Sequence, residues 1–435
     1  MAWRWFEKLK ASKKLRSRKA EAKRRLVFEK STLPCLVIIT GVLLTAANPK
    51  DQQSQPKTGD PSTLSEQELN PVAERKRAAE SIVAQPEKGG ARQDRLGPVK
   101  LIECVDATDA DLRSFAALDG LESLSVAGTN VTDAGLAALV KTHTLRHLWI
   151  GSAIHVYEGR NPGDPQITNE GLKSVGQLVN LESLALCVPR ITGAGMAHLD
   201  GLKHLKFLCL TRSEVGDDGM RSVGGHTTLQ RLDLGRHVTR KGLDELVRLT
   251  SLDELKINRY LKDDDLIPIG QMTNLGSLRS GPALYVTDEG LRHIKTLTRL
   301  RSLDLTEARK VTDEGMAYVA QMTGLETLVL NQRIGDAGIA HLSTLTNLKD
   351  LDLTGSKISD SGLRKLTSLP QLRSLSLMDT RVTAAGVAQL REMKKLKQIG
   401  LDYTDISAKD VTRLKDSGIP ADKTGGSYGG LIRRW

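Results

Sequence analysis

The feature that most constrains this chain is a line of about 24 residues that repeats along it. Residues 300–324 read LRSLDLTEARKVTDEGMAYVAQMTG, and residues 325–347 read LETLVLNQRIGDAGIAHLSTLTN. Each line contains L-x-x-L-x-L, a short polar stretch, V/I-T/G-D-x-G-M/I, and then apolar residues at helical spacing. The period of two predicts a strand, and the period near 3.6 predicts the helix that follows it. Because one unit cannot bury its own leucines, the units must stack against one another.

The same line recurs over most of the chain. Its first strand leucine stands at Leu121, Leu145, Leu181, Leu205, Leu229, Leu252, Leu275, Leu300, Leu325, Leu348, Leu372 and Leu396. The interval stays close to 24 residues except after Leu145, where residues 151–166 form an insertion. Residues 99–120 keep part of the pattern and are expected to form an N-terminal cap. We therefore predict an α/β solenoid over residues 99–419, a right-handed horseshoe with a curved parallel sheet of about twelve strands inside and short helices outside.

A second regularity marks the start of each predicted helix. Threonines stand where an N-cap hydroxyl accepts from the free amides of the first turn, at Thr132, Thr168, Thr192, Thr239, Thr287 and Thr312. An aspartate commonly follows, as at Asp133, Asp288 and Asp313, where negative charge favours the helix N-terminus. A glycine recurs two residues beyond, although glycine costs about 1 kcal/mol in a helix relative to alanine. We expect a close approach of helix and sheet to require this glycine.

Two lines illustrate a family resemblance, VTDAGLAAL (residues 131–139) and ITNEGLKSV (residues 167–175), each after an L-x-x-L-x-L strand. They resemble the short leucine-rich repeats of exported bacterial proteins and the repeats of F-box/leucine-rich-repeat ubiquitin-ligase adaptors. The resemblance covers residues 99–419 and implies the horseshoe fold. At the usual asparagine position the chain has other residues, among them Thr129, Ser213 and Thr380, so threonine or water is expected to satisfy the backbone there. No F-box-like segment precedes the repeats, which argues against the adaptor role.

The net charge of +11 is concentrated at the N-terminus. Residues 1–30 contain twelve Lys or Arg against three Glu, a charge of +9, which leaves +2 for the remainder. We therefore expect no nucleic-acid partner for the repeats. Residues 1–32 form a basic tail that also carries Trp3, Trp5 and Phe6. This composition suits binding to anionic lipid of the inner leaflet.

Residues 33–47, LPCLVIITGVLLTAA, form an uncharged apolar run. Positive charge before the run and little after it predict a signal-anchor of a single-pass membrane protein, with the N-terminus cytoplasmic and the repeats exported. The run is shorter than the ~20 residues that span a bilayer comfortably, so cleavage after Ala47, giving a secreted protein, is one alternative. A cytosolic protein is the other. Residues 48–98 are expected to be a disordered linker, and residues 420–435 a flexible C-terminal tail.

No motif of catalysis stands in the sequence: it lacks a Gly-rich phosphate loop, a nucleophile-elbow serine, H-E-x-x-H and C-x-x-C. We predict a non-catalytic protein with no cofactor and no metal site. The acidic run Asp263, Asp264 and Asp265 is expected to be a solvated helix start and not a cation site. Cys187 and Cys209 fall on neighbouring strands with an offset of two residues, which separates their Cα atoms by ~8 Å and favours free thiols.

The inner face of the predicted sheet is the candidate binding site, because the leucine core does not use its outward side chains. Trp149 and Phe207 lie on this face two repeats apart, and Arg212, Arg236 and Arg259 follow the strands of three consecutive repeats. Aromatic anchors and arginines are common in binding hot spots. The predicted partner-binding residues are His147, Trp149, Tyr157, Phe207, Arg212, Arg231, Arg236, Lys256, Arg259 and Arg279.

An alternative is that Asp217, Asp233 and Glu254 neutralise the three arginines in surface pairs, which would contribute little to stability or binding. The C-terminal part of the same face, around Asp352, Met378 and Asp402, is the second candidate surface. The predicted function is a non-catalytic protein-protein interaction module, exported and membrane-tethered, that binds a protein or an anionic envelope component. A ubiquitin-ligase substrate adaptor and an unrecognised enzyme are the alternatives.

Overall fold

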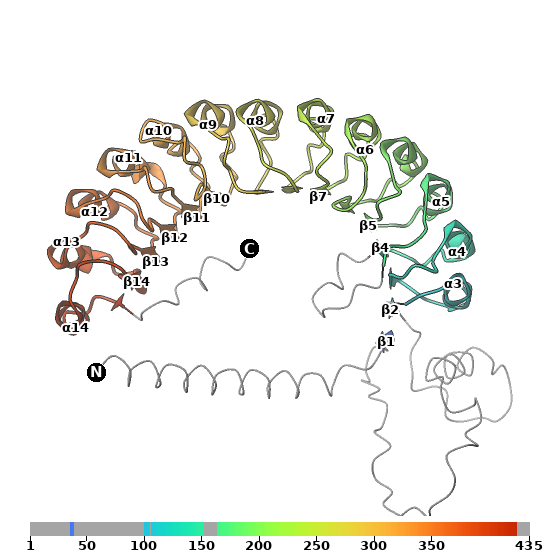
Figure 1. Ribbon diagram of the computed structural model, residues 1–435, viewed down its shortest axis with the longest axis horizontal. Helices are drawn as coiled ribbons and strands as arrows, with labels where there is room; N and C mark the ends of the chain where they lie inside the picture. The colour runs from blue at the N-terminus through green and yellow to red at the C-terminus, as the bar shows by residue number, and fades with distance from the viewer. Residues whose placement is uncertain (1–34, 39–99, 105, 152–162, 424–435) are drawn as a thin grey trace, which may run out of the picture.

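The computed structural model describes residues 35–38, 100–104, 106–151 and 163–423. The repeats form an open arch in which strands line the concave side and helices cover the convex side (Figure 1). All fifteen described strands belong to one sheet, in chain order from β1 to β15. Strands β2 to β15 run parallel, and β1 pairs antiparallel with β2. The predicted α/β solenoid is confirmed.

The strands are short and evenly spaced in the sequence. They are β1 (Cys35–Ile38), β2 (Leu101–Cys104), β3 (Ser123–Val126), β4 (His147–Gly151), β5 (Ser183–Cys187), β6 (Phe207–Cys209), β7 (Arg231–Leu234), β8 (Glu254–Ile257), β9 (Ser277–Ser280), β10 (Ser302–Asp304), β11 (Thr327–Val329), β12 (Asp350–Asp352), β13 (Ser374–Ser376), β14 (Gln398–Gly400) and β15 (Ala421–Asp422).

The convex side carries short helices, some of them 3-10 helices. The α-helices are α3 (Asp109–Ala116), α4 (Asp133–Ala138), α5 (Asn169–Val175), α6 (Met220–Val223), α7 (Arg240–Leu246), α8 (Asp263–Ile269), α9 (Asp288–Ile294), α10 (Met316–Val319), α11 (Asp336–His341), α12 (Asp360–Leu366), α13 (Ala384–Ala388) and α14 (Ala408–Asp416). The 3-10 helices are η2 (Leu139–Lys141), η4 (Gly193–Leu199), η5 (Asp217–Gly219), η6 (Leu342–Thr344) and η7 (Gln389–Glu392).

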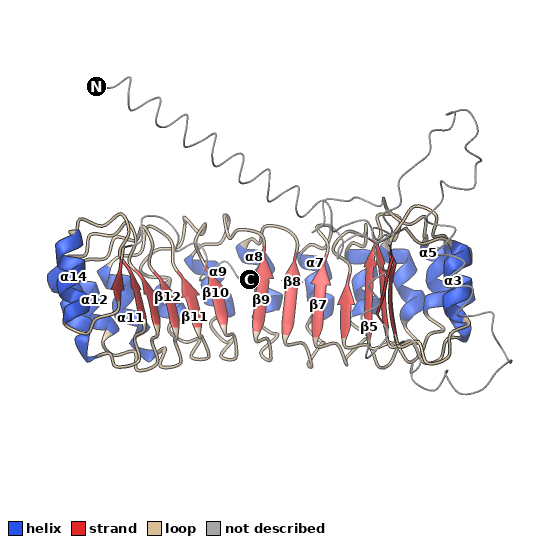
Figure 2. Ribbon diagram, turned by 90° about the horizontal axis from the view of Figure 1, so that it is seen from below, coloured by secondary structure: helices blue, strands red, loops and turns tan. Residues whose placement is uncertain are grey.

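The period of two in each strand decides which side chains enter the core. Between β10 and β11, Leu303 pairs with Leu328, and both side chains are buried under the helices. The next residues, Asp304 and Val329, pair with each other on the opposite face. Because this register continues from strand to strand, the outward positions of successive repeats form rows along the concave face (Figure 2).

The parallel sheet extends beyond the strands that the sequence predicts. The partial repeat at residues 99–120 contributes β2, which pairs with β3. At the other end, β15 pairs with β14, and the Lys423 ammonium donates to the carbonyl oxygens of Thr404 and Ile406, both at 2.8 Å. The repeat domain therefore continues past residue 419, into the segment that was assigned to the flexible tail.

Four residues of the predicted membrane segment take part in the sheet. In β1, Cys35 lies opposite Cys104 and Ile38 lies opposite Leu101. The rest of residues 1–98, with the predicted basic tail and linker, lies outside the described residues, as do residues 424–435. In the part of the chain that is described, no helix is both long enough and apolar enough to cross a membrane.

The helix starts of successive repeats are hydrogen-bonded to one another. The Thr132, Thr168 and Thr287 hydroxyls cap their own helices as predicted. The prediction is wrong for the other three, because Thr192 and Thr239 make no such bond and Thr312 is not an N-cap. In addition, the backbone N–H at this position of a repeat donates to the acidic or amide side chain at the start of the helical segment of the preceding repeat. In the repeat of α10, Thr312 and Asp313 hold these positions although they precede the helix itself. We call this arrangement the Asp–Thr ladder. Its nine rungs in the described residues are Asp109–Thr132, Asp133–Thr168, Asn169–Thr192, Asp217–Thr239, Asp263–Thr287, Asp288–Thr312, Asp313–Gly335, Asp336–Ser359 and Asp360–Thr383.

The recurring glycine is required by this ladder. A Cβ on Gly315 would lie 2.1 Å from Oδ1 of Asp288 and 3.1 Å from Cδ1 of Leu291, both in the preceding helix α9. A Cβ on Gly135 would lie 2.4 Å from Oδ1 of Asp109. The expected approach of helix and sheet is therefore wrong as an explanation: the glycine permits one helix to lie against the start of the previous one.

Candidate partner-binding surface

The sheet register brings the predicted strand residues together on the concave face. One row runs through His147, Ser183, Phe207, Arg231 and Glu254, and the neighbouring row runs through Trp149, Ala185, Cys209, Asp233, Lys256 and Arg279. Successive residues of a row lie on adjacent strands, about 4.8 Å apart. The two rows therefore form a continuous surface across β4 to β9.

An aromatic cluster occupies the N-terminal part of this surface. Trp149 and Phe207 are partly buried and pack against Ala185, Cys187 and Cys209, which together form a small apolar cluster separate from the leucine core. The His147 ring stacks on the Trp149 ring, with 5.8 Å between centroids and 8° between planes. Both rings project from β4, whose Leu148 points the other way into the core. The sheet thus holds aromatic surface on its solvent side.

The two cysteines under these rings interact as thiols. Ala185 pairs with Cys209 in the register, so the predicted offset of two residues between Cys187 and Cys209 is confirmed. Their Sγ atoms lie 3.8 Å apart, well beyond the ~2.0 Å of a disulfide bond. The Thr211 hydroxyl lies 3.6 Å from one Sγ and 3.4 Å from the other. The hydrogen bond between the thiols lowers the pKa of Cys209 and, together with burial, raises the pKa of Cys187.

Arg231 covers the second aromatic ring. Its guanidinium carbon lies 5.0 Å from the centroid of Phe207, a cation–π geometry. Nε and Nη2 donate to the two carboxylate oxygens of Asp233, both at 3.1 Å, and Nη1 lies 3.6 Å from Glu254. Asp233 is only 5% exposed, so the pair is held in one geometry. Arg231 therefore holds Phe207 in place, and its positive charge is compensated by Asp233 and Glu254.

We call Arg212, Arg236 and Arg259, which follow three consecutive strands, the arginine stripe. Two of them are also paired. Arg212 lies 3.3 Å from Asp164, the carboxylate at the C-terminal end of the insertion. Arg236 lies 3.8 Å from Glu214 and donates from Nε to the His237 ring at 3.1 Å. The side chain of Arg212 is 38% exposed and that of Arg236 is 72% exposed. Both arginines have a carboxylate partner, as the alternative interpretation predicted, but not one of the carboxylates that it named.

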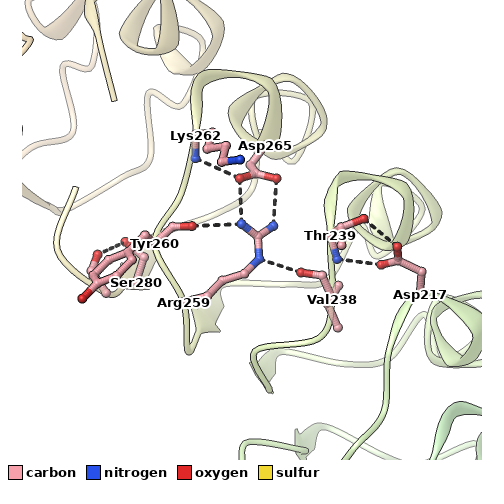
Figure 3. A network of polar contacts seen from close by, with 9 residues as sticks. Asp217, Val238, Thr239, Arg259, Tyr260, Lys262, Asp265 and Ser280 are labelled. Atoms are coloured by element: carbon pink, nitrogen blue, oxygen red, sulfur yellow. Dashed lines mark hydrogen bonds and ion pairs between the residues drawn. The ribbon is translucent and has the colours of Figure 1, made fainter. Parts of the chain in front are cut away.

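The third arginine of the stripe, Arg259, belongs to the fold (Figure 3). Its two terminal nitrogens donate to both oxygens of Asp265 at 2.7 and 2.8 Å, and Nε donates to the carbonyl of Val238 at 2.6 Å. The Arg259 side chain is 18% exposed and that of Asp265 is 7% exposed. Burial opposes ionisation of Asp265, but the hydrogen bonds from Arg259 outweigh it and lower the pKa of Asp265.

This network replaces a missing rung of the Asp–Thr ladder. Arg240 stands where the start of α7 would need an aspartate, and Lys262 stands at the next N-cap. The Lys262 N–H instead donates to Asp265 of its own helix at 2.8 Å, while Arg259 links that carboxylate to Val238 of the preceding repeat. The acidic run 263–265 is thereby accounted for, since Asp263 also serves as a rung to Thr287. Arg259 therefore has a structural role and is not part of the candidate site.

Lys256 and Arg279 are different from the other cations of this face. They are adjacent in the row that begins at Trp149, on β8 and β9. Neither forms an ion pair within 4.0 Å in the described residues, where the nearby carboxylates Asp233 and Glu254 are engaged by Arg231. Tyr157, the remaining predicted site residue, lies outside the described residues. Among the predicted site residues that the structure describes, Lys256 and Arg279 are therefore the two Lys or Arg residues without an ion pair.

The C-terminal half of the concave face is acidic. Asp304 and Asp352 continue the row of Trp149, and Asp350 lies beside Asp352 in the other row. Oδ1 of Asp304 accepts from the N–H and hydroxyl of Thr306, and Thr354 makes the same bonds to Asp352. Burial raises the pKa of Asp350. These residues were visible in the sequence as outward strand positions, but no aromatic residue marked them as a site.

A shallow groove of about 660 Å³ lies along the edge where β4 to β7 begin. Glu182 lies in its lining and accepts from Lys206 and Arg146, both at 2.6 Å. These two hydrogen bonds lower the pKa of Glu182 to about 2. The groove is thus lined by charges that already neutralise one another. Among the described residues, no group of three or more His, Cys, Asp or Glu is placed to hold a metal ion.

Comparison with known proteins agrees with the fold. The model of the family described as "Leucine Rich repeat" matches residues 121–140 and 344–366. A search of curated proteins finds no match. The crystal structure of an internalin from Listeria monocytogenes is similar with a TM-score of 0.50 and 19% identity, over 81% of this chain and 94% of that one. A leucine-rich repeat protein of Leptospira interrogans gives a TM-score of 0.49 and 18% identity, over 75% and 89% of the two chains.

Proposed function

We propose that the chain, whose fold is a leucine-rich repeat solenoid, is a non-catalytic interaction module that binds a protein partner on its concave face. One observation carries the proposal. Trp149 and Phe207 present partly exposed rings on this face, and the leucine core uses neither of them. Rigid aromatic side chains on a preformed surface are typical anchors of protein interfaces, because little side-chain entropy is lost when they bind.

The solenoid favours this use for a physical reason. Each strand is fixed by its neighbours on both sides, so the concave rows keep their geometry in the absence of a partner. A surface that is already ordered loses little conformational entropy on association. Substrate turnover would need convergent acid, base or nucleophilic groups, whereas the carboxylates that surround the aromatic cluster are held in ion pairs.

The test is capture of partners from an envelope extract by the immobilised full-length protein, with quantitative comparison of variants. Trp149→Ala and Phe207→Ala are each expected to reduce recovery of at least one partner tenfold. Val179→Ala is the control, since it removes an apolar side chain that is 51% exposed outside the two rows. Far-UV circular dichroism identifies variants that remain folded. If folded variants recover every captured protein as well as the control does, the concave face is not the binding site.

We also propose that the repeats are exported and tethered to a membrane through residues 33–47. The apolar run and the +9 charge before it support this topology. Because Cys35–Ile38 pair with β2, insertion of the run into a bilayer requires that β1 leave the sheet edge. Protease added to intact cells should digest the repeats while an N-terminal tag survives. Complete protection of the repeats would contradict export.

A further inference from the structure

The concave face changes sign along the solenoid. We propose that its partner is a polypeptide segment of opposite polarity, with an apolar side chain on the aromatic cluster, acidic side chains over Lys256 and Arg279, and basic side chains over Asp304, Asp350 and Asp352. This inference rests on the proposed function and specifies the partner. It selects a mixed-charge protein segment over an anionic envelope polymer.

The cationic part is defined by the ion pairs around it. Arg231, Arg212 and Arg236 have carboxylate partners, whereas Lys256 and Arg279 have none within 4.0 Å in the described residues. Both project from strands, so the register fixes where their side chains leave the sheet. A carboxylate bound here satisfies charges that the fold leaves unpaired. Phe207 lies two strands from Lys256 and two residues away along the strand, which separates their Cα atoms by about 12 Å at ~4.8 Å per strand and ~3.3 Å per residue.

The acidic part begins on the next strand. Asp304 and Asp352 each use Oδ1 to hold a turn threonine, which fixes the carboxylate and leaves Oδ2 for a further donor. Asp350 is partly buried, and burial raises its pKa against the opposing charges of Arg373 and Lys349. Three carboxylates on β10 and β12 therefore favour a basic segment and repel a uniform polyanion.

The distances set the length of the segment. From Trp149 on β4 to Asp352 on β12 there are eight strand steps, about 38 Å at ~4.8 Å per step. An extended chain covers ~3.3 Å per residue, so about twelve residues reach from the aromatic cluster to the acidic part. The apolar, acidic and basic positions of such a peptide are ordered in one direction, because the surface is not symmetric.

The experiment is a selection from a random twelve-residue peptide display library on the immobilised full-length protein. The variants are Lys256→Gln with Arg279→Gln, and Asp304→Asn with Asp350→Asn and Asp352→Asn. Asparagine keeps the Oδ1 acceptor that the turns need. The control is Lys141→Gln with Lys241→Gln, which removes two exposed convex-side cations. Every variant carries the same N-terminal tail, so the contribution of the tail cancels.

Peptides selected on the wild type are expected to have acidic and basic residues in separate blocks. The first variant should lose the acidic block, the second the basic block, and the control neither; resynthesised peptides should bind each site variant at least tenfold more weakly. Selections without segregated charge, or unchanged by both variants, overturn the inference. Equal competition by a twelve-residue polyglutamate also overturns it, in favour of an anionic polymer.

The same peptides separate this inference from the proposed function. If Trp149→Ala weakens their binding while both charge variants leave it unchanged, the concave face binds proteins but the partner has no charge polarity. If neither Trp149→Ala nor the charge variants weaken binding of any selected peptide, both proposals fail.

Discussion

Replacing Gly338 by alanine tests whether the recurring glycine is required by the preceding helix. A Cβ on Gly338 would lie 2.5 Å from Oδ1 of Asp313, 2.9 Å from Cγ2 of Ile334 and 3.0 Å from Cγ of Met316. These atoms belong to a packed core and to a ladder carboxylate, so they have little room to move. The substitution must therefore displace the α11 helix or break the rung between Asp313 and Gly335.

The expected loss follows from three contributions. Overpacking costs ~1–3 kcal/mol, and loss of a hydrogen bond to a charged group costs ~1.5–3 kcal/mol, while alanine favours the helix over glycine by ~1 kcal/mol. The net expectation is a decrease of ~1.5–5 kcal/mol in the free energy of unfolding. Helix propensity alone predicts the opposite sign, because alanine is the better helix former.

Gly335 is the matched control in the same repeat. A Cβ there would lie 3.5 Å from Oδ2 of Asp313 and 3.9 Å from Lys357, which are ordinary contacts, and the φ of −120° suits any residue. Gly335→Ala should therefore change stability by less than ~1 kcal/mol. Gly335→Thr should stabilise the protein by ~0.5–1.5 kcal/mol, because the new hydroxyl can donate to Oδ2 of Asp313 as in the other rungs.

Urea unfolding followed by far-UV circular dichroism measures these differences. The reasoning is refuted if Gly338→Ala is as stable as Gly335→Ala. A stabilised Gly338→Ala protein would show that helix propensity, and not contact with Asp313, governs this position.

Three further predictions use the same measurement. Leu303→Ala should cost ~2–5 kcal/mol as a core truncation, whereas Ser302→Ala on the opposite face should change stability by less than ~0.5 kcal/mol; equal effects would show that the register is wrong. Arg259→Ala should cost ~3–5 kcal/mol, because it leaves the Asp265 carboxylate buried without its cation; a loss below ~1 kcal/mol would contradict a structural role. Asp350→Asn should raise the urea midpoint at pH 7, because the pKa of Asp350 is raised in the folded protein. Such a carboxyl contributes stability below its unfolded pKa of about 3.9, and this stability is lost as the pH rises through the folded pKa. The gain from asparagine should therefore vanish near pH 3, and a gain that persists there would have another cause.

The horseshoe was predictable because each leucine is fixed by two local periods and by its neighbours in the stack. Leu303 and Leu328 are buried and paired as the sequence requires. Strands β2 and β15 were not predicted, because their backbones complete the ladder without the full leucine pattern. β15 has a partner on one side only, so fewer of its side chains must be leucine, whereas β2 lies between β1 and β3.

The Asp–Thr ladder could not be derived from one repeat, because its bonds join residues about 23 positions apart. The sequence showed that threonine, aspartate and glycine recur together, and a local cap explained the first two. It did not show that the carboxylate of Asp288 serves the next repeat, nor that Gly315 avoids that carboxylate. In the structure, the threonine and the aspartate form the hydrogen bond between successive repeats, and the glycine leaves room for the carboxylate.

The three arginines after the strands show which side-chain directions can be predicted from a repeat position and which cannot. Arg212, Arg236 and Arg259 occupy one repeat position, yet their partners differ. Arg212 pairs with Asp164 of the insertion, Arg236 with Glu214, and Arg259 with Asp265 at the start of α8. These arginines lie in the loops after the strands, and there the loop conformation sets the direction of each side chain. Lys256 and Arg279 stand within strands, so the ladder fixes their direction and their spacing. Lys256 and Arg279 therefore hold their charges at defined places on the sheet, whereas the three arginines after the strands do not, and we place the cationic part of the proposed binding surface at that pair.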